Sequence, residues 1–131
     1  MNLSNLSCGT YTIVYPSGEH RTIRVKMGFK NTVKECKIVG YLSGPNNEGD
    51  YTYFGHITSD GGIIFWRSWT TSNQGIRING IIRALARLAS SKEECGKAYA
   101  LKSGRCWRCN RLLTVPESIK RGIGPECLTK I

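Results

Sequence analysis

The sequence predicts an α+β fold in which a small antiparallel β-sheet or barrel precedes two helices and a treble-clef-like zinc module. Three observations support this prediction. Five short segments rich in β-branched and aromatic residues, separated by turn signals, occupy the N-terminal part of the chain. The apolar spacing becomes helical from Ile78 onward. Finally, three of the six cysteines are concentrated between Cys106 and Cys127.

The predicted strands alternate with turn-forming residues. Pro16-Ser17-Gly18 separates the first two strands, which we expect to form a hairpin, and Ser59 to Gly62 separates the last two. Gly40 interrupts the third strand and is expected to mark a β-bulge. Five short strands with such turns are typical of a small antiparallel sheet or barrel. The predicted strands are residues 10–15, 21–27, 36–42, 51–58 and 63–69.

Two helices are predicted after the strands. The first carries an apolar stripe at helical spacing, and Asn79 is its candidate N-cap. The second spans residues 92 to about 102, where Ser91 and Glu94 form a capping box and Gly104 marks the end. The stripe consists of Ile78, Ile81, Ile82, Leu85, Leu88 and Ala89. We therefore divide the chain into a β domain, residues 1–74, and a helical segment with the zinc module, residues 75–131.

The positive charge is concentrated in the C-terminal half. The formal net charge of the chain is +10. Residues 1–74 carry seven Lys or Arg and five Asp or Glu, whereas residues 75–131 carry twelve and four, which gives +2 and +8. Four thiolates around one Zn²⁺ would leave about +6 in the second part. This asymmetry favours an anionic partner, nucleic acid first.

The sequence also indicates the compartment. No apolar run approaches the length of a membrane span, and the N-terminus lacks the basic start and apolar core of a secretory signal. We therefore expect a cytoplasmic protein that does not engage a membrane. In a reducing cytosol, closely spaced cysteines are more often metal ligands than disulfide partners.

Three cysteines have the spacing of zinc ligands. Cys106 and Cys109 form a C-x-x-C turn, which brings two thiolates within reach of one metal ion. Cys127 follows Gly124-Pro125, and proline at a helix start places this cysteine in the first helical turn, where the helix dipole favours a thiolate. Because no metalloprotease or deaminase motif accompanies these cysteines, we expect a structural zinc site rather than a catalytic one.

The fourth ligand is less well defined than the other three. A treble clef would offer a ligand three residues after Cys127, but Lys130 stands there. Cys95 on the preceding helix is the favoured candidate. Further candidates that could reach the site through the fold are Cys8, Cys36, His20 and His56, although Cys8 and Cys36 are better interpreted as small buried hydrophobic residues.

The stretch GRCWRCNRLLTVPESIKRGIGPEC, residues 104–127, resembles a small zinc-finger-like family of unknown function found in bacteriophage and actinobacterial proteins. The pattern is G-x-C-x-x-C-x-R-x-L-T-x-P-x-S-I-x-x-G-I-G-P-x-C. The resemblance implies a zinc module, metal binding by the three cysteines and an origin in phage or mobile DNA, and it carries no activity. It also implies scaffold roles for Arg111, Ser118, Gly122, Gly124 and Pro125.

Basic and aromatic residues around the cysteines are candidate binding residues for nucleic acid or another partner. Trp107 lies inside the knuckle, where it could stack on a base, insert into a protein partner or pack against the second helix. The aromatics between Tyr51 and Trp69 could form a stacking platform or fill the core. The candidate surface comprises Arg83, Arg87, Arg105, Trp107, Arg108, Arg111, Lys120 and Arg121.

These observations lead to two functional hypotheses. The first is a non-enzymatic accessory protein of a phage or mobile element that binds nucleic acid through its basic C-terminal face, with zinc holding that face in shape. The second is a protein-binding inhibitor or modulator of a host factor, acting in anti-defence or replication takeover. A metal-dependent enzyme is a third, weaker alternative.

Overall fold

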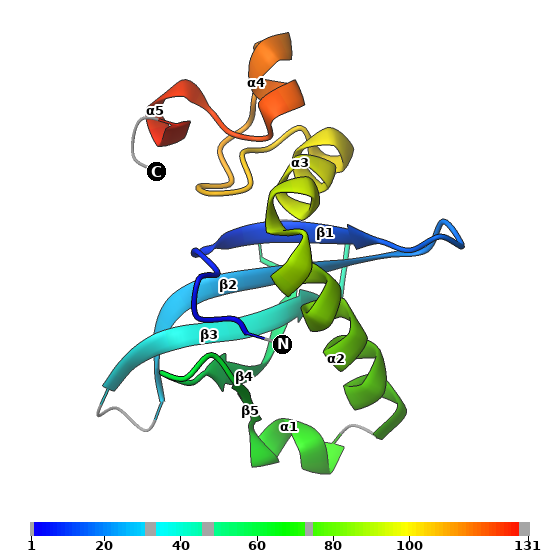
Figure 1. The fold of residues 1–131 in the computed structure, drawn as a ribbon, viewed down its shortest axis with the longest axis vertical. Coiled ribbons are helices and arrows are strands. Elements are labelled where there is room, and N and C mark those ends of the chain that lie inside the picture. Colours follow the sequence, from blue (N-terminus) through cyan, green and yellow to red (C-terminus); the bar gives the residue numbers. More distant parts are fainter. Residues whose placement is uncertain (1, 31–33, 46–48, 73–74, 129–131) are drawn as a thin grey trace.

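The computed structural model describes residues 2–30, 34–45, 49–72 and 75–128. These residues form a five-stranded antiparallel sheet, with the strands in sequence order, and five helices (Figure 1). The predicted α+β class with an antiparallel sheet is confirmed. The strands are β1 (Gly9–Val14), β2 (His20–Lys30), β3 (Lys34–Leu42), β4 (Tyr51–Ile57) and β5 (Ile63–Phe65). The helices are α1 (Arg67–Ser72), α2 (Gly75–Ser90), α3 (Lys92–Ser103), α4 (Pro116–Arg121) and α5 (Pro125–Leu128).

The sheet follows the predicted pattern of alternation and turns. β1 and β2 form a hairpin whose turn contains Gly18 at φ +90°. The register between β3 and β4 shifts between Val39 and Gly40, so the predicted bulge is confirmed. Alternate residues such as Ile23 and Val25 are buried, because they face the helical layer.

The fifth predicted strand is too long. β5 ends at Phe65, and the Trp66 amide still donates to the Phe54 carbonyl at 2.8 Å. The Trp66 carbonyl then accepts from the amides of Trp69 and Thr70, which starts α1. This turn places the Trp69 ring 5.5 Å from the Phe54 ring and 5.8 Å from the Phe65 ring. The helix forms there because it buries Trp69, so the core interpretation of these aromatics is confirmed for Phe54 and Trp69.

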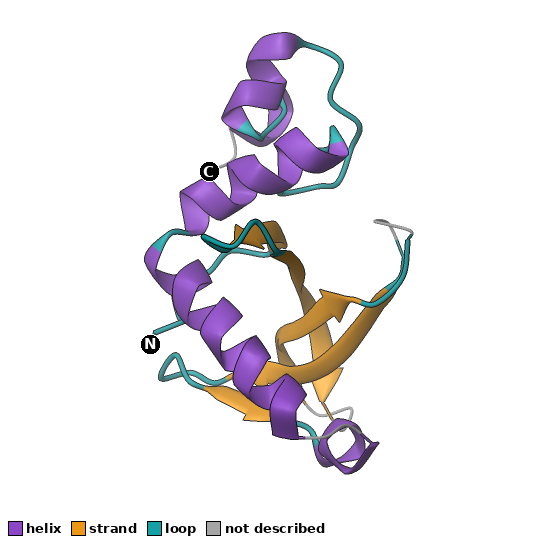
Figure 2. Cartoon of the chain, turned by 90° about the vertical axis from the view of Figure 1, so that its right-hand side faces the viewer, coloured by secondary structure: helices purple, strands orange, loops and turns teal. Residues whose placement is uncertain are grey.

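Helix α2 covers the curved sheet (Figure 2). Its apolar stripe supplies Ile81, Leu85 and Leu88, which are fully buried in one core with the strands. The helix begins at Gly75, so the prediction that Asn79 caps it is wrong. Because α2 and the strands share this core, the boundary predicted at residue 74 does not separate two hydrophobic cores.

Helix α3 packs along β1 and carries the C-terminal segment away from the sheet (Figure 1). It ends as predicted at Gly104, which adopts φ +72°. The predicted capping box is absent, because the Ser91 side chain makes no capping hydrogen bond. No helix in the described ranges is long and apolar enough to cross a membrane. The end of α3 and the segment that follows it form a second, smaller core. The buried members of this core are Ala100, Cys106, Leu113, Ile123 and Cys127.

Candidate metal centre and the basic clefts around it

The first two cysteines lie on a tight hairpin. Arg105 pairs with Leu112, the Cys106 amide donates to the Arg111 carbonyl at 2.8 Å, and the Asn110 amide donates to the Cys106 carbonyl at 2.9 Å. Asn110 adopts φ +66°, a left-handed conformation that asparagine tolerates better than most residues. The chain therefore reverses directly after Cys109, which turns both thiols toward the same side.

The third cysteine reaches the hairpin through two short helices. Gly122 ends α4 at φ +81°, and its carbonyl accepts a hydrogen bond of 2.9 Å from the Trp107 amide. Pro125 then opens α5, as predicted, and Cys127 is its third residue. This backbone hydrogen bond fixes the path that brings Cys127 back to the knuckle.

The three thiols gather at one point. The sulfur atoms of Cys106, Cys109 and Cys127 all lie within 4.8 Å of one another. Cys106 is 0% exposed and Cys127 is 7% exposed, whereas Cys109 is exposed to solvent. The cluster has the size and donor type of a metal site with one accessible ligand.

The environments of two of these thiols differ. Burial opposes ionisation of Cys106, but the backbone amides of Cys109, Gly124 and Arg108 outweigh it and lower the pKa of this thiol. Although Cys109 is exposed as a residue, the partial burial of its thiol, with the nearby thiols of Cys127 and Cys106, raises the pKa of Cys109 to about 11, and the Arg111 amide opposes this shift. The backbone therefore stabilises a thiolate at Cys106, the form that binds a metal ion.

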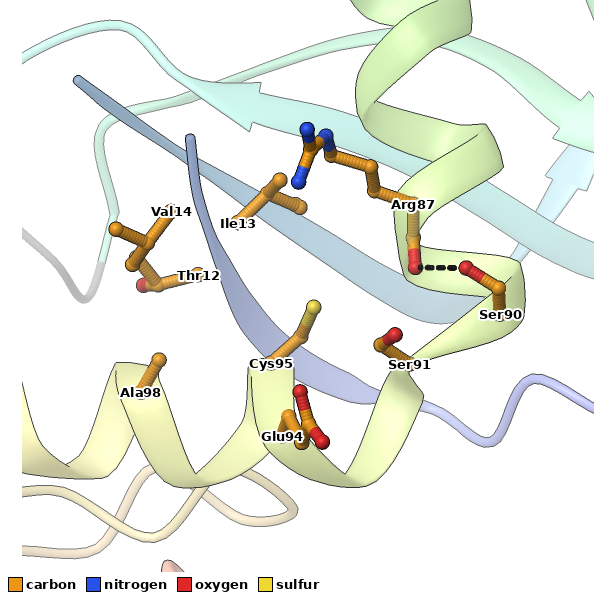
Figure 3. A pocket seen from close by; sticks show the side chains of 9 residues that line it. All are labelled: Thr12, Ile13, Val14, Arg87, Ser90, Ser91, Glu94, Cys95 and Ala98. Carbon is orange, nitrogen blue, oxygen red and sulfur yellow. Dashed lines mark hydrogen bonds between the residues drawn. The ribbon is translucent and has the colours of Figure 1, made fainter. Parts of the chain in front are cut away.

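Cys95 is not brought to this cluster. It is buried in the larger core, and its sulfur is turned toward β1, beside Ile13, on the side of α3 away from the knuckle (Figure 3). Burial raises the pKa of Cys95 to about 11, an effect that nearby Glu94 reinforces and Arg87 opposes. The prediction that Cys95 supplies the fourth ligand is therefore not supported.

The other candidate ligands also lie elsewhere. His56 accepts a hydrogen bond of 3.0 Å at Nδ1 from the Trp66 indole, and His20 begins β2 opposite Val14. Cys8 and Cys36 are partly buried and have no bond to another cysteine. Among the residues that the structure describes, no fourth His, Cys, Asp or Glu joins the cluster, and Lys130 lies outside those residues.

Trp107 joins the two parts of the molecule. Its ring packs against Gly96 of α3, lies against Gly9 of β1 and stands 5.4 Å from the Tyr11 ring. Its carbonyl accepts a hydrogen bond of 2.5 Å from the Thr10 amide at the sheet edge. Of the three roles considered for Trp107, packing against the second helix is the one that the structure shows.

The candidate basic residues do not form one face. Arg105 is partly buried and donates to the Asn110 carbonyl at 3.0 Å, which gives it a role inside the hairpin. On α2, Arg87 lies over the Tyr15 ring at 5.2 Å, and Arg83 is exposed. Lys120 is exposed on α4. Helix α2, which carries Arg83 and Arg87, and helix α4, which carries Lys120, lie at opposite ends of α3 (Figure 1), so these cations do not share one surface.

The remaining candidates line three clefts around the cysteine cluster. The cysteine cleft, about 350 Å³, contains Arg108 and Arg111 beside the three cysteines. The strand cleft, about 420 Å³, contains Arg24, Lys26 and Arg108 beside Cys8, Cys109 and Asn110. The tryptophan cleft, about 320 Å³, is lined by Ser7, Tyr11, Lys92, Glu93, Lys97, Trp107, Arg121, Ile123 and Leu128. Among these lining residues, seven are cationic and only Glu93 is acidic.

Sequence reasoning missed part of these clefts. Arg24 and Lys26 reach the knuckle from β2, where they lie over the rings of Tyr51 and Tyr53 at 3.9 and 4.6 Å. Their alternation with Ile23 and Val25 marked them as facing away from the core, but not what they would approach. Asn110 could have been found, because asparagine directly after a C-x-x-C turn favours the left-handed conformation seen here.

Residues 96–131 match a family described as a family of unknown function (DUF6011). The matched segment starts at Gly96, which packs on Trp107, and includes the whole cysteine cluster. This agrees with the resemblance to a family of unknown function. No curated protein and no solved structure matches the chain significantly.

Proposed function

We propose that the cysteine cluster is a structural zinc site in a treble-clef-like module. The C-x-x-C hairpin and a third thiolate on a short helix are the parts of such a module, and soft thiolate ligands favour zinc. The described side chains that line the cysteine cleft beside the thiols are two arginines, hydroxyl groups and aliphatic groups, which suits a structural metal.

The function that the geometry supports best is binding of nucleic acid by the clefts around this module. The observation that carries the proposal is their charge: among the residues that the structure describes, seven cations and one carboxylate line the three clefts. Cations held on two or three sides of a cleft can contact successive phosphates of one strand. The zinc module would fix Arg108, Arg111 and Arg121 relative to Arg24 and Lys26 of the sheet. The resemblance to phage and actinobacterial proteins is consistent with an accessory role on mobile DNA in the bacterial cytoplasm.

A specific observation also favours a protein partner as a second candidate. Leu101, Leu112 and Val115 are 73%, 59% and 47% exposed, and Leu112 and Val115 both border the cysteine cleft. Exposed apolar side chains at a cleft are common where a protein partner docks. This is the surface that an inhibitor of a host factor would use.

Anisotropy of labelled single-stranded and duplex oligonucleotides, measured over a salt series, tests the proposal. We expect the logarithm of the affinity to fall linearly with the logarithm of salt concentration. Replacing Arg108 and Arg111 by glutamine should weaken binding about tenfold and flatten the salt dependence. The control for each single substitution is Arg83→Gln, which removes one charge on α2, away from the clefts. Absence of any binding at low salt would refute the proposal and favour the protein partner.

A further inference from the structure

The tryptophan cleft combines an apolar wall with a cationic rim. Its wall is formed by the rings of Tyr11 and Trp107 and the side chain of Ile123. Tyr11 is 2% exposed and Ile123 is 3% exposed, so both are fixed in the two cores and support the Trp107 ring, which is the partly exposed member of the wall. A ring that is fixed by packing from behind presents a preformed surface to a flat ligand.

The Trp107 ring is held in place but still has an unused polar group. Gly9 and Gly96 approach it so closely that an added Cβ would come within 2.6 and 3.0 Å of the indole. The indole N–H has no acceptor among the described residues, yet it is not fully buried. A rigid ring with a free donor at a cleft is a common recognition element for ligands with both flat and polar parts.

The rim of the cleft is positive. Lys92, Lys97 and Arg121 surround it, and Glu93 is its one acidic member among the described residues. The Lys92 ammonium donates to the Asn5 carbonyl at 3.1 Å, which holds that charge near the mouth. Three cations from two helices, α3 and α4, provide more positive charge than a single carboxylate would neutralise, which favours a ligand with more than one phosphate.

We propose that the tryptophan cleft accepts one unpaired nucleobase of a single-stranded nucleic acid, with the flanking phosphates on its cationic rim. The proposal deepens, and rests on, nucleic-acid binding by the module. At about 320 Å³ the cleft is at the lower end of small-ligand sites, which is enough for one base. A duplex keeps its bases stacked inside, so the cleft discriminates single strands from duplexes.

Indole N–H signals in a ¹H–¹⁵N NMR spectrum give a direct readout, with the Trp107 signal assigned by Trp107→Phe. A short single-stranded oligonucleotide should shift this signal. An abasic strand of the same length should bind about tenfold more weakly and leave the signal in place. A duplex should also leave it unshifted.

A variant in which the cleft is blocked provides the second test. Ser7 lines the cleft but uses its carbonyl, not its side chain, to accept from the Tyr11 hydroxyl at 2.7 Å. Ser7→Phe should reduce the affinity for the intact strand to that of the abasic strand, whereas Ser17→Phe, in the exposed β1–β2 turn, should not. Equal binding of intact and abasic strands by the wild type would overturn the base site while nucleic-acid binding stands. Binding of neither strand would overturn both, and a shift caused only by an acidic aromatic peptide would assign the cleft to a protein.

Discussion

The two cores of this protein are stabilised in different ways. The larger core joins the strands to α2 and α3 through large, fully buried side chains such as Ile23, Phe54 and Leu85. Among the described residues the smaller core has five buried members, and two of them are the cysteines Cys106 and Cys127. In the second region, the metal-ligating candidates occupy the positions that large aliphatic residues would fill in an ordinary core.

This difference indicates where the stability of each region originates. Segments shorter than about 40 residues rarely bury enough apolar surface to fold without a disulfide, a metal or a partner. The segment after α3 is of this kind, and its cysteines are free of disulfides. We therefore expect it to depend on metal binding, and on Trp107, which packs it against Gly9 and Gly96 of the larger region.

Removing the metal should have the largest effect, because it should unfold the smaller region and leave the larger one folded. The purified protein should contain about one zinc per chain by elemental analysis, and a chelator should erase the dispersed amide signals of residues 104–127 but not those of the strands. The reason is that about 10 kcal/mol or more of metal-binding free energy contributes to folding of such sites. Cys106→Ser should have the same effect, and Cys36→Ser should not. A metal-free protein with an intact knuckle spectrum would contradict this expectation.

Truncating a side chain in the larger core should lower the free energy of unfolding and leave metal binding unchanged. Leu85 is fully buried under the sheet, so Leu85→Ala should lower the free energy of unfolding by about 2–5 kcal/mol. The zinc content of the folded protein should stay unchanged. Leu101→Ala is the control, because Leu101 is 73% exposed and its loss should change stability by less than about 0.5 kcal/mol. Thermal unfolding and elemental analysis of both variants provide the two readouts, and loss of zinc from Leu85→Ala would show that the regions are not independent.

The same contrast explains which features the sequence could predict. Alternation along the strands and the stripe on α2 report burial in a large apolar core, and the positions of the first four strands, the bulge at Gly40 and the end of α3 at Gly104 were predicted correctly. The switch to helix after Phe65 was missed, because it depends on Trp69 reaching Phe54 across the sheet, which local propensity does not show.

The candidate site, too, could be predicted only in part. The three clustered cysteines could be predicted, because their spacing within the chain largely determines their geometry. The position of Cys95 could not, because the direction of a side chain on α3 depends on how that helix packs on β1. The approach of Arg24 and Lys26 to the knuckle was missed for the same reason: it is a contact between regions that are distant in the sequence.

Two glycines in the left-handed conformation allow the coupling between the two regions to be measured. Their substitution should have a smaller effect than metal removal or truncation in the core. Gly18 and Gly122 have similar φ angles, +90° and +81°. A Cβ at Gly18 would meet nothing within 4 Å, whereas one at Gly122 would come within 2.9 Å of the Lys97 Cα. Both alanine variants should lose about 1 kcal/mol from the backbone conformation alone. Gly122→Ala should lose about 1 kcal/mol more, because α3 and α4 must move apart.

Denaturant unfolding of the two variants, combined with the rate of zinc loss to a chelator, separates these contributions. The backbone penalty is common to both, so the difference between them reports the packing of α4 on α3. Since the Gly122 carbonyl also accepts from the Trp107 amide, the displacement at Gly122 should reach the knuckle and speed zinc loss, while Gly18→Ala should leave it unchanged. Equal stability losses and equal rates of zinc loss would mean that the metal holds the knuckle without help from the α3–α4 contact.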